Sequence, residues 1–238
     1  CQQGDEYFTC IRKFSLERVR AELQYIAQRT SSSSLMLADS NFGMYAHDID
    51  ICKEIIAVKN QYGWPKFFHS ALGKNNKANI VKVVTAMQEA GIHIPLLAAV
   101  QSTDREVLKN IKRENVSLDF YFDLANTVNF KGVTGFSEVI VCLPGDTKEA
   151  HFKSAFDLID AGMHTVRSHQ LIMAARAEIS ADKTRRQYRM MTRFRVMPQT
   201  VDSYRIFEKD FITPEIDEIC VSNASMSFDD YLECRMFD

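Results

Sequence analysis

Residues 138–147 read Glu138-Val139-Ile140-Val141-Cys142-Leu143-Pro144-Gly145-Asp146-Thr147. The stretch begins as a short apolar run and ends in a Pro-Gly-Asp turn, which is typical of a buried strand followed by a loop. A helix is predicted from Thr147 to Ala161, closed by Gly162, and a second strand is predicted to start at His164. Strands that are apolar almost throughout are buried on both faces, which indicates parallel strands covered by helices. This strand–helix–strand unit therefore predicts an α/β fold.

The same unit recurs along most of the chain. Strands are predicted over residues 35–38, 66–71, 95–100, 136–143 and 164–173. Helices are predicted after Ser15, over residues 48–62, around 80–87, after Asp104, over 118–129 and over 147–161. Five such units with short loops fit either a partial barrel or a doubly wound sheet.

The alternation stops after about residue 174. Residues 175–238 are predicted to be a trailing segment that packs on the sheet or extends past it, so the chain divides into 1–174 and 175–238. The basic run between Lys183 and Arg195 indicates a solvated face rather than a phosphate or nucleic-acid site. A last helix is predicted after Ser227, with acidic residues in its first turn.

The composition excludes several classes of function. The 29 basic and 31 acidic residues nearly balance, so no overall field favours nucleic acid or an anionic membrane. No apolar run approaches the roughly 20 residues that span a bilayer. The six cysteines are scattered without a two-residue-spaced pair, and the histidines show no metal spacing. Cys52 and Cys142 are predicted to be buried free thiols, which fits a reducing, cytoplasmic setting.

Polar side chains follow several of the predicted strands directly. They are Asp39, Asn41, Lys74, Asn75, Gln101, Ser102, Asp146 and Gln170. Because the carboxyl ends of parallel strands meet at one edge of a sheet, these residues predict a ligand site there. Some also have a purely structural interpretation, since Asp39 and Asn41 suit a turn and Ser102 suits a helix start.

Two of these strand ends resemble motifs of a known family. Residues 98–113 (Ala-Ala-Val-Gln-Ser-Thr-Asp-Arg-Glu-Val-Leu-Lys-Asn-Ile-Lys-Arg) resemble the fourth-strand motif of radical S-adenosylmethionine enzymes, in which a Gln/Glu-Ser pair ends the strand. Residues 138–147 resemble the fifth-strand motif, which has Gly where Cys142 stands. Cys1 is similar to the third cysteine of the family's Cys-x3-Cys-x2-Cys loop. The resemblance covers about residues 1–175 and is closest to proteins with an amino-terminal cobalamin-binding domain.

The resemblance implies a fold and a set of cofactors. The fold would be a partial (β/α)6 TIM-like barrel with mostly parallel strands, and its first strand would be missing from this chain. A 4Fe-4S cluster would take Cys1 as one ligand, and a Cys-x3-Cys-x2 stretch would precede Cys1 in a longer protein. Cobalamin would bind in a domain outside the chain. The residues expected to hold S-adenosylmethionine are Asp39, Asn41, Asn75, Gln101, Ser102, Arg113 and Gln170, with Arg113 suited to its carboxylate.

The reaction implied is reductive cleavage of S-adenosylmethionine to a 5′-deoxyadenosyl radical. That radical would serve hydrogen abstraction or cobalamin-dependent methyl transfer on a small-molecule or biosynthetic substrate. The electron donor would be a flavodoxin or ferredoxin-type protein, and a fragment of this length would be inactive alone.

Two alternatives remain open at this point. The chain could be a non-catalytic relative that keeps the barrel as a binding or assembly module. It could also be an aldolase-like enzyme, which needs a Schiff-base lysine on a strand; Lys66 opens a strand and Lys74 follows its end.

Overall fold

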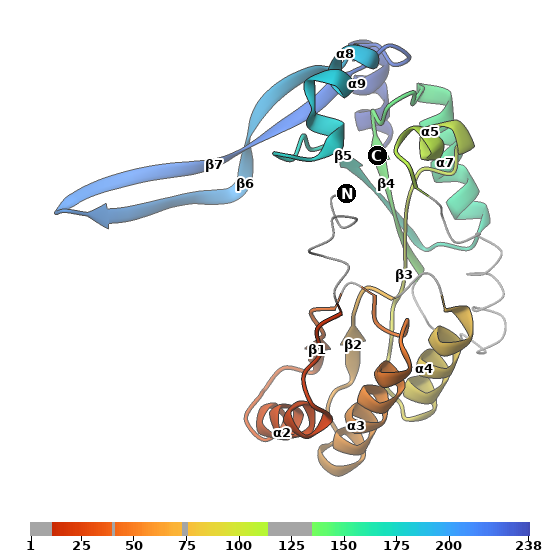
Figure 1. Ribbon diagram of the computed structural model, residues 1–238, viewed down its shortest axis with the longest axis vertical. Helices are drawn as coiled ribbons and strands as arrows, with labels where there is room; N and C mark the ends of the chain where they lie inside the picture. The colour runs from red at the N-terminus through yellow and green to blue at the C-terminus, as the bar shows by residue number, and fades with distance from the viewer. Residues whose placement is uncertain (1–10, 40, 73–75, 114–134) are drawn as a thin grey trace.

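The computed structural model describes residues 11–39, 41–72, 76–113 and 135–238 (Figure 1). The first part alternates helices and strands: α2 (Leu16–Ala27), β1 (Ser34–Met36), α3 (Ala46–Tyr62), β2 (Phe67–His69), α4 (Lys77–Glu89), β3 (Leu96–Gln101), α5 (Arg105–Asn110), β4 (Gly135–Val141), α7 (Lys148–Asp160) and β5 (Thr165–Gln170). The predicted alternation is thus confirmed wherever the structure describes it, and the helix predicted over 118–129 lies outside the described residues.

The helices begin where the sequence supplies a capping side chain. Ser15 accepts a hydrogen bond from the backbone of Arg18, and Asp104 accepts from Glu106 and Val107. Such caps satisfy backbone N–H groups that have no partner inside the helix. The predicted starts of α2 and α5 are therefore confirmed.

The strands lie side by side in chain order. β1 pairs with β2, and β3, β4 and β5 form a second sheet, with every pairing parallel. A parallel bridge from Phe67 in β2 to His93, just before β3, links the two sheets. The helices that connect the strands lie along the outer side of the strands in Figure 1. The α/β class with parallel strands is confirmed.

The carboxyl-terminal part of the chain is built differently. It contains a short 3-10 helix (Glu178–Ser180), α8 (Asp182–Gln187), the strands β6 (Met191–Ile206) and β7 (Lys209–Ser222), and α9 (Phe228–Phe237). β6 and β7 form an antiparallel hairpin that projects far from the body (Figure 1). Its tip is exposed, with Phe207 94% accessible to solvent.

The base of the hairpin extends the parallel sheet. Ile172, just after β5, bridges Ile219 of β7 in antiparallel fashion. The backbone N–H of Met173 donates to the carbonyl of Glu218 at 2.8 Å, and the N–H of Cys220 donates to Leu171 at 2.9 Å. The neighbour of β5 on this side is therefore an antiparallel strand that comes from about 50 residues further along the chain.

Two buried clusters hold these layers together. The first lies under β1 to β4 and includes Phe42, Ile55, Phe68 and Leu158, all with no accessible surface. The second joins the end of β4 to β7 and α9, and its buried members include Cys142, Leu143, Cys220, Met226, Tyr231 and Cys234. Cys52 and Cys142 are buried free thiols, as predicted. Among the described helices, none is both long and apolar enough to cross a membrane.

Candidate functional site

The end of β3 is the first feature of the candidate site. The pairing with β4 slips by one residue between Ala99 and Gln101, and Gln101 takes a left-handed backbone conformation with φ of 61°. Such a conformation is uncommon for a residue with a side chain and marks strained or functional backbone. The side-chain oxygen of Gln101 is buried and has no hydrogen-bond partner among the residues that the structure describes.

The end of β4 repeats this arrangement on the neighbouring strand. Cys142 is fully buried and has φ of 68°. Its backbone N–H donates to the carboxylate of Asp146 at 3.1 Å. A left-handed φ favours glycine, which gives a physical reason for the glycine in the fifth-strand motif that this segment resembles. β3 and β4, which pair with each other, therefore each end in a left-handed residue, although Gln101 is level with Val139, three residues before Cys142.

Asp146 lies buried beneath this turn. Burial raises the pKa of its carboxyl group to about 7, against the charge of His151 and the backbone donors at Cys142 and Thr147, which lower it. One carboxylate oxygen has no partner among the described residues. Gly145 in the same turn packs so closely that a Cβ there would lie 2.5 Å from the side-chain nitrogen of Asn110. The Pro-Gly-Asp turn is thus fixed by packing as well as by turn chemistry.

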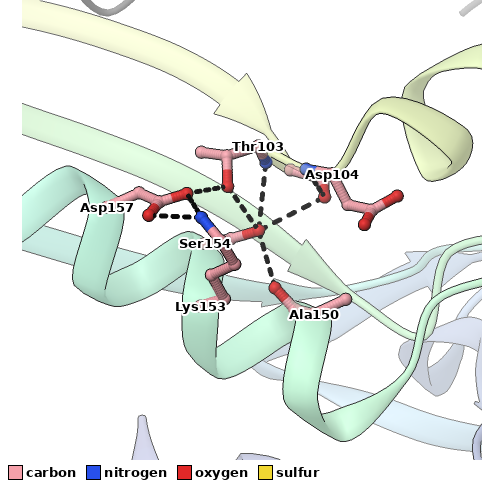
Figure 2. Close-up of polar contacts among 7 residues, drawn as sticks. Thr103, Asp104, Ala150, Lys153, Ser154 and Asp157 are labelled. Atoms are coloured by element: carbon pink, nitrogen blue, oxygen red, sulfur yellow. Dashed lines mark hydrogen bonds and ion pairs between the residues drawn. The ribbon is translucent and has the colours of Figure 1, made fainter.

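Ser102 belongs to a hydrogen-bonded cluster on the helix side of the sheet (Figure 2). The Oγ of Ser154 in α7 lies 3.3 Å from the Oγ of Ser102, and accepts from the backbone N–H of Thr103 at 3.0 Å. Thr103 also donates to Asp157 at 2.6 Å, and Lys153 donates to the same carboxylate. These groups satisfy one another, so the cluster ties the start of α5 to α7.

A cavity of about 330 Å³ opens beside this cluster. Its lining residues are Thr103, Asp104, Arg105, Glu106, Ala150 and Lys153, all from α5, α7 and the turn before α5. It therefore lies among the covering helices and not on the uncovered side of the strands.

Asp39 and Asn41 lie two residues apart in the segment after β1, beside the end of β2. The carboxylate of Asp39 accepts from the backbone N–H of Asn41 at 2.8 Å, and the hydroxyl of Ser70 donates to the Asp39 carbonyl at 3.3 Å. Both predicted residues are exposed to solvent. Their mutual hydrogen bond is of the kind that the predicted turn would make, and their exposure leaves both side chains accessible to a ligand.

Gln170 and Arg113 are placed less directly for a ligand at the strand ends. The amide of Gln170 contacts the hydroxyl of Tyr231 and the guanidinium of Arg195. Arg113 is half-buried just after α5, and its backbone N–H donates to Leu108. Cys1, Lys74 and Asn75 lie outside the described residues, so their predicted roles stay predictions. The described part of the chain holds no group of three side chains suited to a metal ion.

The face of the β4–β5 sheet that the described helices leave uncovered carries residues that strand-end reasoning missed. In β4, Ser137, Val139 and Val141 are buried toward the helices, so Phe136, Glu138 and Ile140 point to the other face. Glu138 contacts His169 of β5 at 3.2 Å, and the guanidinium of Arg167 lies 5.3 Å from the centre of the Phe136 ring. Polar residues alternating with apolar ones inside these strands were the signal that could have found them.

Comparison with known proteins gives consistent matches, although no protein-family model matches the chain. It is 26% identical over 193 residues to the cobalamin-dependent radical SAM methyltransferase TokK of Streptomyces tokunonensis, covering 81% of this chain and 28% of that protein. It is 24% identical over 243 residues to the 2-(S-pantetheinyl)-carbapenam-3-carboxylate methyltransferase of Streptantibioticus cattleyicolor, covering 100% of this chain and 34% of that protein. The chain thus spans about a third of the length of these curated relatives.

A solved structure supports the fold. The radical S-adenosylmethionine methyltransferase TsrM of Kitasatospora setae, with tryptophan and a SAM analogue bound, superposes with a TM-score of 0.50 at 14% identity. The match covers 67% of this chain and 30% of the TsrM chain.

Proposed function

We propose, from its similarity to radical S-adenosylmethionine methyltransferases, that the chain belongs to that superfamily and forms the S-adenosylmethionine- and substrate-binding part of a cobalamin-dependent radical methyltransferase. The parallel strands in chain order would be most of a partial (β/α)6 barrel. Residues 1–174 would be its core and residues 175–238 an extension of that core. The protein would work in the cytoplasm with a flavodoxin or ferredoxin-type electron donor.

The observation that carries this proposal is that the paired strands β3 and β4 each end in a left-handed residue. Gln101 and Cys142 turn the backbone at the edge where parallel sheets bind ligands, and the buried oxygen of Gln101 has no partner among the described residues. A ribose or amino donor of S-adenosylmethionine would satisfy that oxygen, which otherwise carries a desolvation cost of about 1–3 kcal/mol. The residues present at this edge therefore fit the cofactor.

The other predicted residues have defined tasks in this proposal. Asp39 and Asn41 stand exposed beside the end of β2, where they would bind the polar end of the cofactor. Ser102 would act through the backbone of the β3–α5 turn, which its contact with Ser154 holds in place. Arg113, Gln170 and Asn75 would bind the amino acid headgroup or orient the residues that do, and Cys1 would be one cluster ligand.

The cofactors supply the difficult chemistry when bound: the 4Fe-4S cluster delivers the electron that cleaves the sulfonium, and cobalamin carries the methyl group. This chain's own residues would bind the nucleoside, orient it along the strand ends and exclude water from the uncovered face of the sheet.

The test uses the full-length protein, reconstituted anaerobically with iron, sulfide and cobalamin. We expect Gln101→Ala to weaken S-adenosylmethionine binding by about fivefold or more in isothermal titration calorimetry, because one hydrogen bond to a buried oxygen is lost. The matched control Gln61→Ala changes an exposed glutamine of α3 and should leave the affinity unchanged.

Two results would contradict the proposal. One is a wild-type protein that shows no cluster spectrum and no reductive cleavage of S-adenosylmethionine, as a non-catalytic binding module would. The other is an affinity for S-adenosylmethionine that Gln101→Ala leaves unchanged.

A further inference from the structure

The uncovered face of β4 and β5 carries a cation without a counter-ion among the described residues. Arg167 of β5 is exposed, and its guanidinium lies over the ring of Phe136, 5.3 Å from its centre. Glu138 stands directly opposite Arg167 in the parallel register, yet its carboxylate contacts His169 at 3.2 Å. No carboxylate of the described residues forms an ion pair with Arg167.

The orientation of these side chains follows from the strand geometry. Ser168, between Arg167 and His169, lies 3.3 Å from His151 of α7, so it faces the helices. Successive side chains of a strand point to opposite faces. Arg167 and His169 therefore point away from the helices, as do Phe136, Glu138 and Ile140 of the neighbouring strand.

We propose that Arg167 binds a carboxylate of the substrate on this uncovered face, so that the protein acts on a small organic acid; this inference rests on the proposed function above. A guanidinium offers a planar fork of N–H donors that matches a carboxylate bidentately. The cation–π contact with Phe136 positions the guanidinium of Arg167 from one side. The N–H groups at the edge of the guanidinium remain available to donate to a carboxylate.

The charge next to Arg167 determines whether a singly or a doubly charged anion would bind there more favourably. The Glu138 carboxylate on the next strand repels a second negative charge, so a monoanion fits this face better than a phosphate dianion. Phe136 presents a partly exposed apolar ring beside Glu138, which suits the carbon skeleton of the acid, whereas Ile140 packs against the second core.

The test uses ligand-observed ¹⁹F NMR on the full-length protein with two isosteric probes, 4-fluorobenzoate and 4-fluorobenzamide. We expect the wild type to bind the carboxylate at least about fivefold more tightly than the amide. Arg167→Gln should reduce that preference to within about twofold, and Arg167→Lys, which keeps the charge but loses the fork, should fall between. The matched control Arg105→Gln alters an exposed arginine on the helix side and should keep the full preference.

Equal binding of the two probes by the wild type, or a preference that survives in Arg167→Gln, would overturn the assignment. The bound carboxylate could also come from the cofactor, because S-adenosylmethionine carries one. Saturating S-adenosylmethionine should therefore leave 4-fluorobenzoate bound, and its displacement would assign Arg167 to the cofactor and overturn the inference.

Failure of the proposed function would look different from failure of this inference. A wrong proposed function would leave the wild type unable to cleave S-adenosylmethionine, whereas a wrong inference about Arg167 would leave that cleavage by the wild type intact and remove only the preference for the carboxylate probe. The thermal unfolding of Arg167→Gln, followed by circular dichroism, should match that of the wild type because Arg167 is exposed.

Discussion

The sulfur atoms of Cys142 and Cys220 lie 3.6 Å apart, and their contact joins the end of β4 to β7 inside the second core. The hydrogen bond to Cys220, together with burial, raises the pKa of the Cys142 thiol. Both side chains are fully buried, so they pack as small apolar groups. Because Cys142 also has a left-handed backbone, its packing and its backbone conformation have opposing effects on stability.

The first prediction separates these two effects at Cys142. A residue with a Cβ in the left-handed region costs about 1–2 kcal/mol relative to glycine. We therefore expect Cys142→Gly to have a free energy of unfolding equal to or higher than that of Cys142→Ala, although glycine fills less of the core. Urea unfolding of the two variants measures the difference.

Cys234 provides the matched control, because it is equally buried but lies inside α9. In a helix, glycine is about 1 kcal/mol less favourable than alanine. Cys234→Gly should therefore be less stable than Cys234→Ala. The same order of stability at both positions would show that the backbone of Cys142 is unstrained.

The second prediction concerns Ser154, which accepts from the backbone N–H of Thr103 and donates to the carbonyl of Ala150 at 2.9 Å. Ser154→Ala leaves a partly buried N–H without its acceptor, so it should lower the free energy of unfolding by about 1–3 kcal/mol. Lys153→Ala, one residue away but exposed, should change it by less than about 0.5 kcal/mol. Similar small effects of both substitutions would remove the structural role given to Ser154.

The third prediction follows from the raised pKa of Asp146. The folded protein keeps this carboxyl protonated up to about pH 7, whereas the unfolded chain releases the proton near its usual pKa of 3.8. The free energy of unfolding should therefore decrease as the pH rises from about 4 to 7. Asp146→Asn should flatten that part of the pH profile, while its amide oxygen can still accept from Cys142. A wild-type profile without this decrease would mean that Asp146 is ionised in the folded protein.

The fourth prediction is a pH dependence of the free energy of unfolding that is opposite in direction to that expected for Asp146. Arg185 donates two hydrogen bonds to Glu218, at 2.5 and 2.7 Å, and Thr192 donates a third, so the pKa of Glu218 falls to about 2. The stabilisation from this carboxylate should be complete above its usual pKa of 4.5 and decrease as the pH falls toward 2. Glu218→Gln should lower stability at neutral pH and weaken the acid dependence. The prediction would be contradicted if the wild type and Glu218→Gln lost stability equally as the pH falls from 4.5 toward 2.

The sequence predicts the alternating elements well because each is encoded locally. Apolar runs, caps such as Ser15 and Asp104, and the Pro-Gly-Asp turn act within a few residues of where they stand. The antiparallel pairing of β7 beside β5 could not be predicted in the same way. It depends on a contact between Ile172 and Ile219, which no local pattern of either segment specifies.

The sequence predicts which edge of the sheet carries the candidate site, but it does not predict which face of the sheet each strand residue points to. Reasoning from strand ends brings Gln101 and the residues after β4 to one edge of the sheet, as the pairing of β3 with β4 bears out. Successive residues of a strand point to opposite faces of the sheet. Gln170 is two residues after Ser168, so both point to the helix-covered face, where Ser168 contacts His151 and Gln170 contacts Tyr231 of α9. Arg167 and His169 alternate with these residues along β5 and therefore point to the opposite, uncovered face.

The second core also bears on how the protein is synthesised. Among the described residues, the buried members of the first core all lie between Leu23 and Met163, so this core can form while the ribosome is still translating the rest of the chain. The end of β4 must wait for Cys220, which follows Cys142 by 78 residues. At about 5–20 residues per second, this leaves the thiol of Cys142 uncovered for about 4–16 s during each round of translation. In that interval chaperones, oxidants and metal ions can reach a side chain that the finished protein seals off.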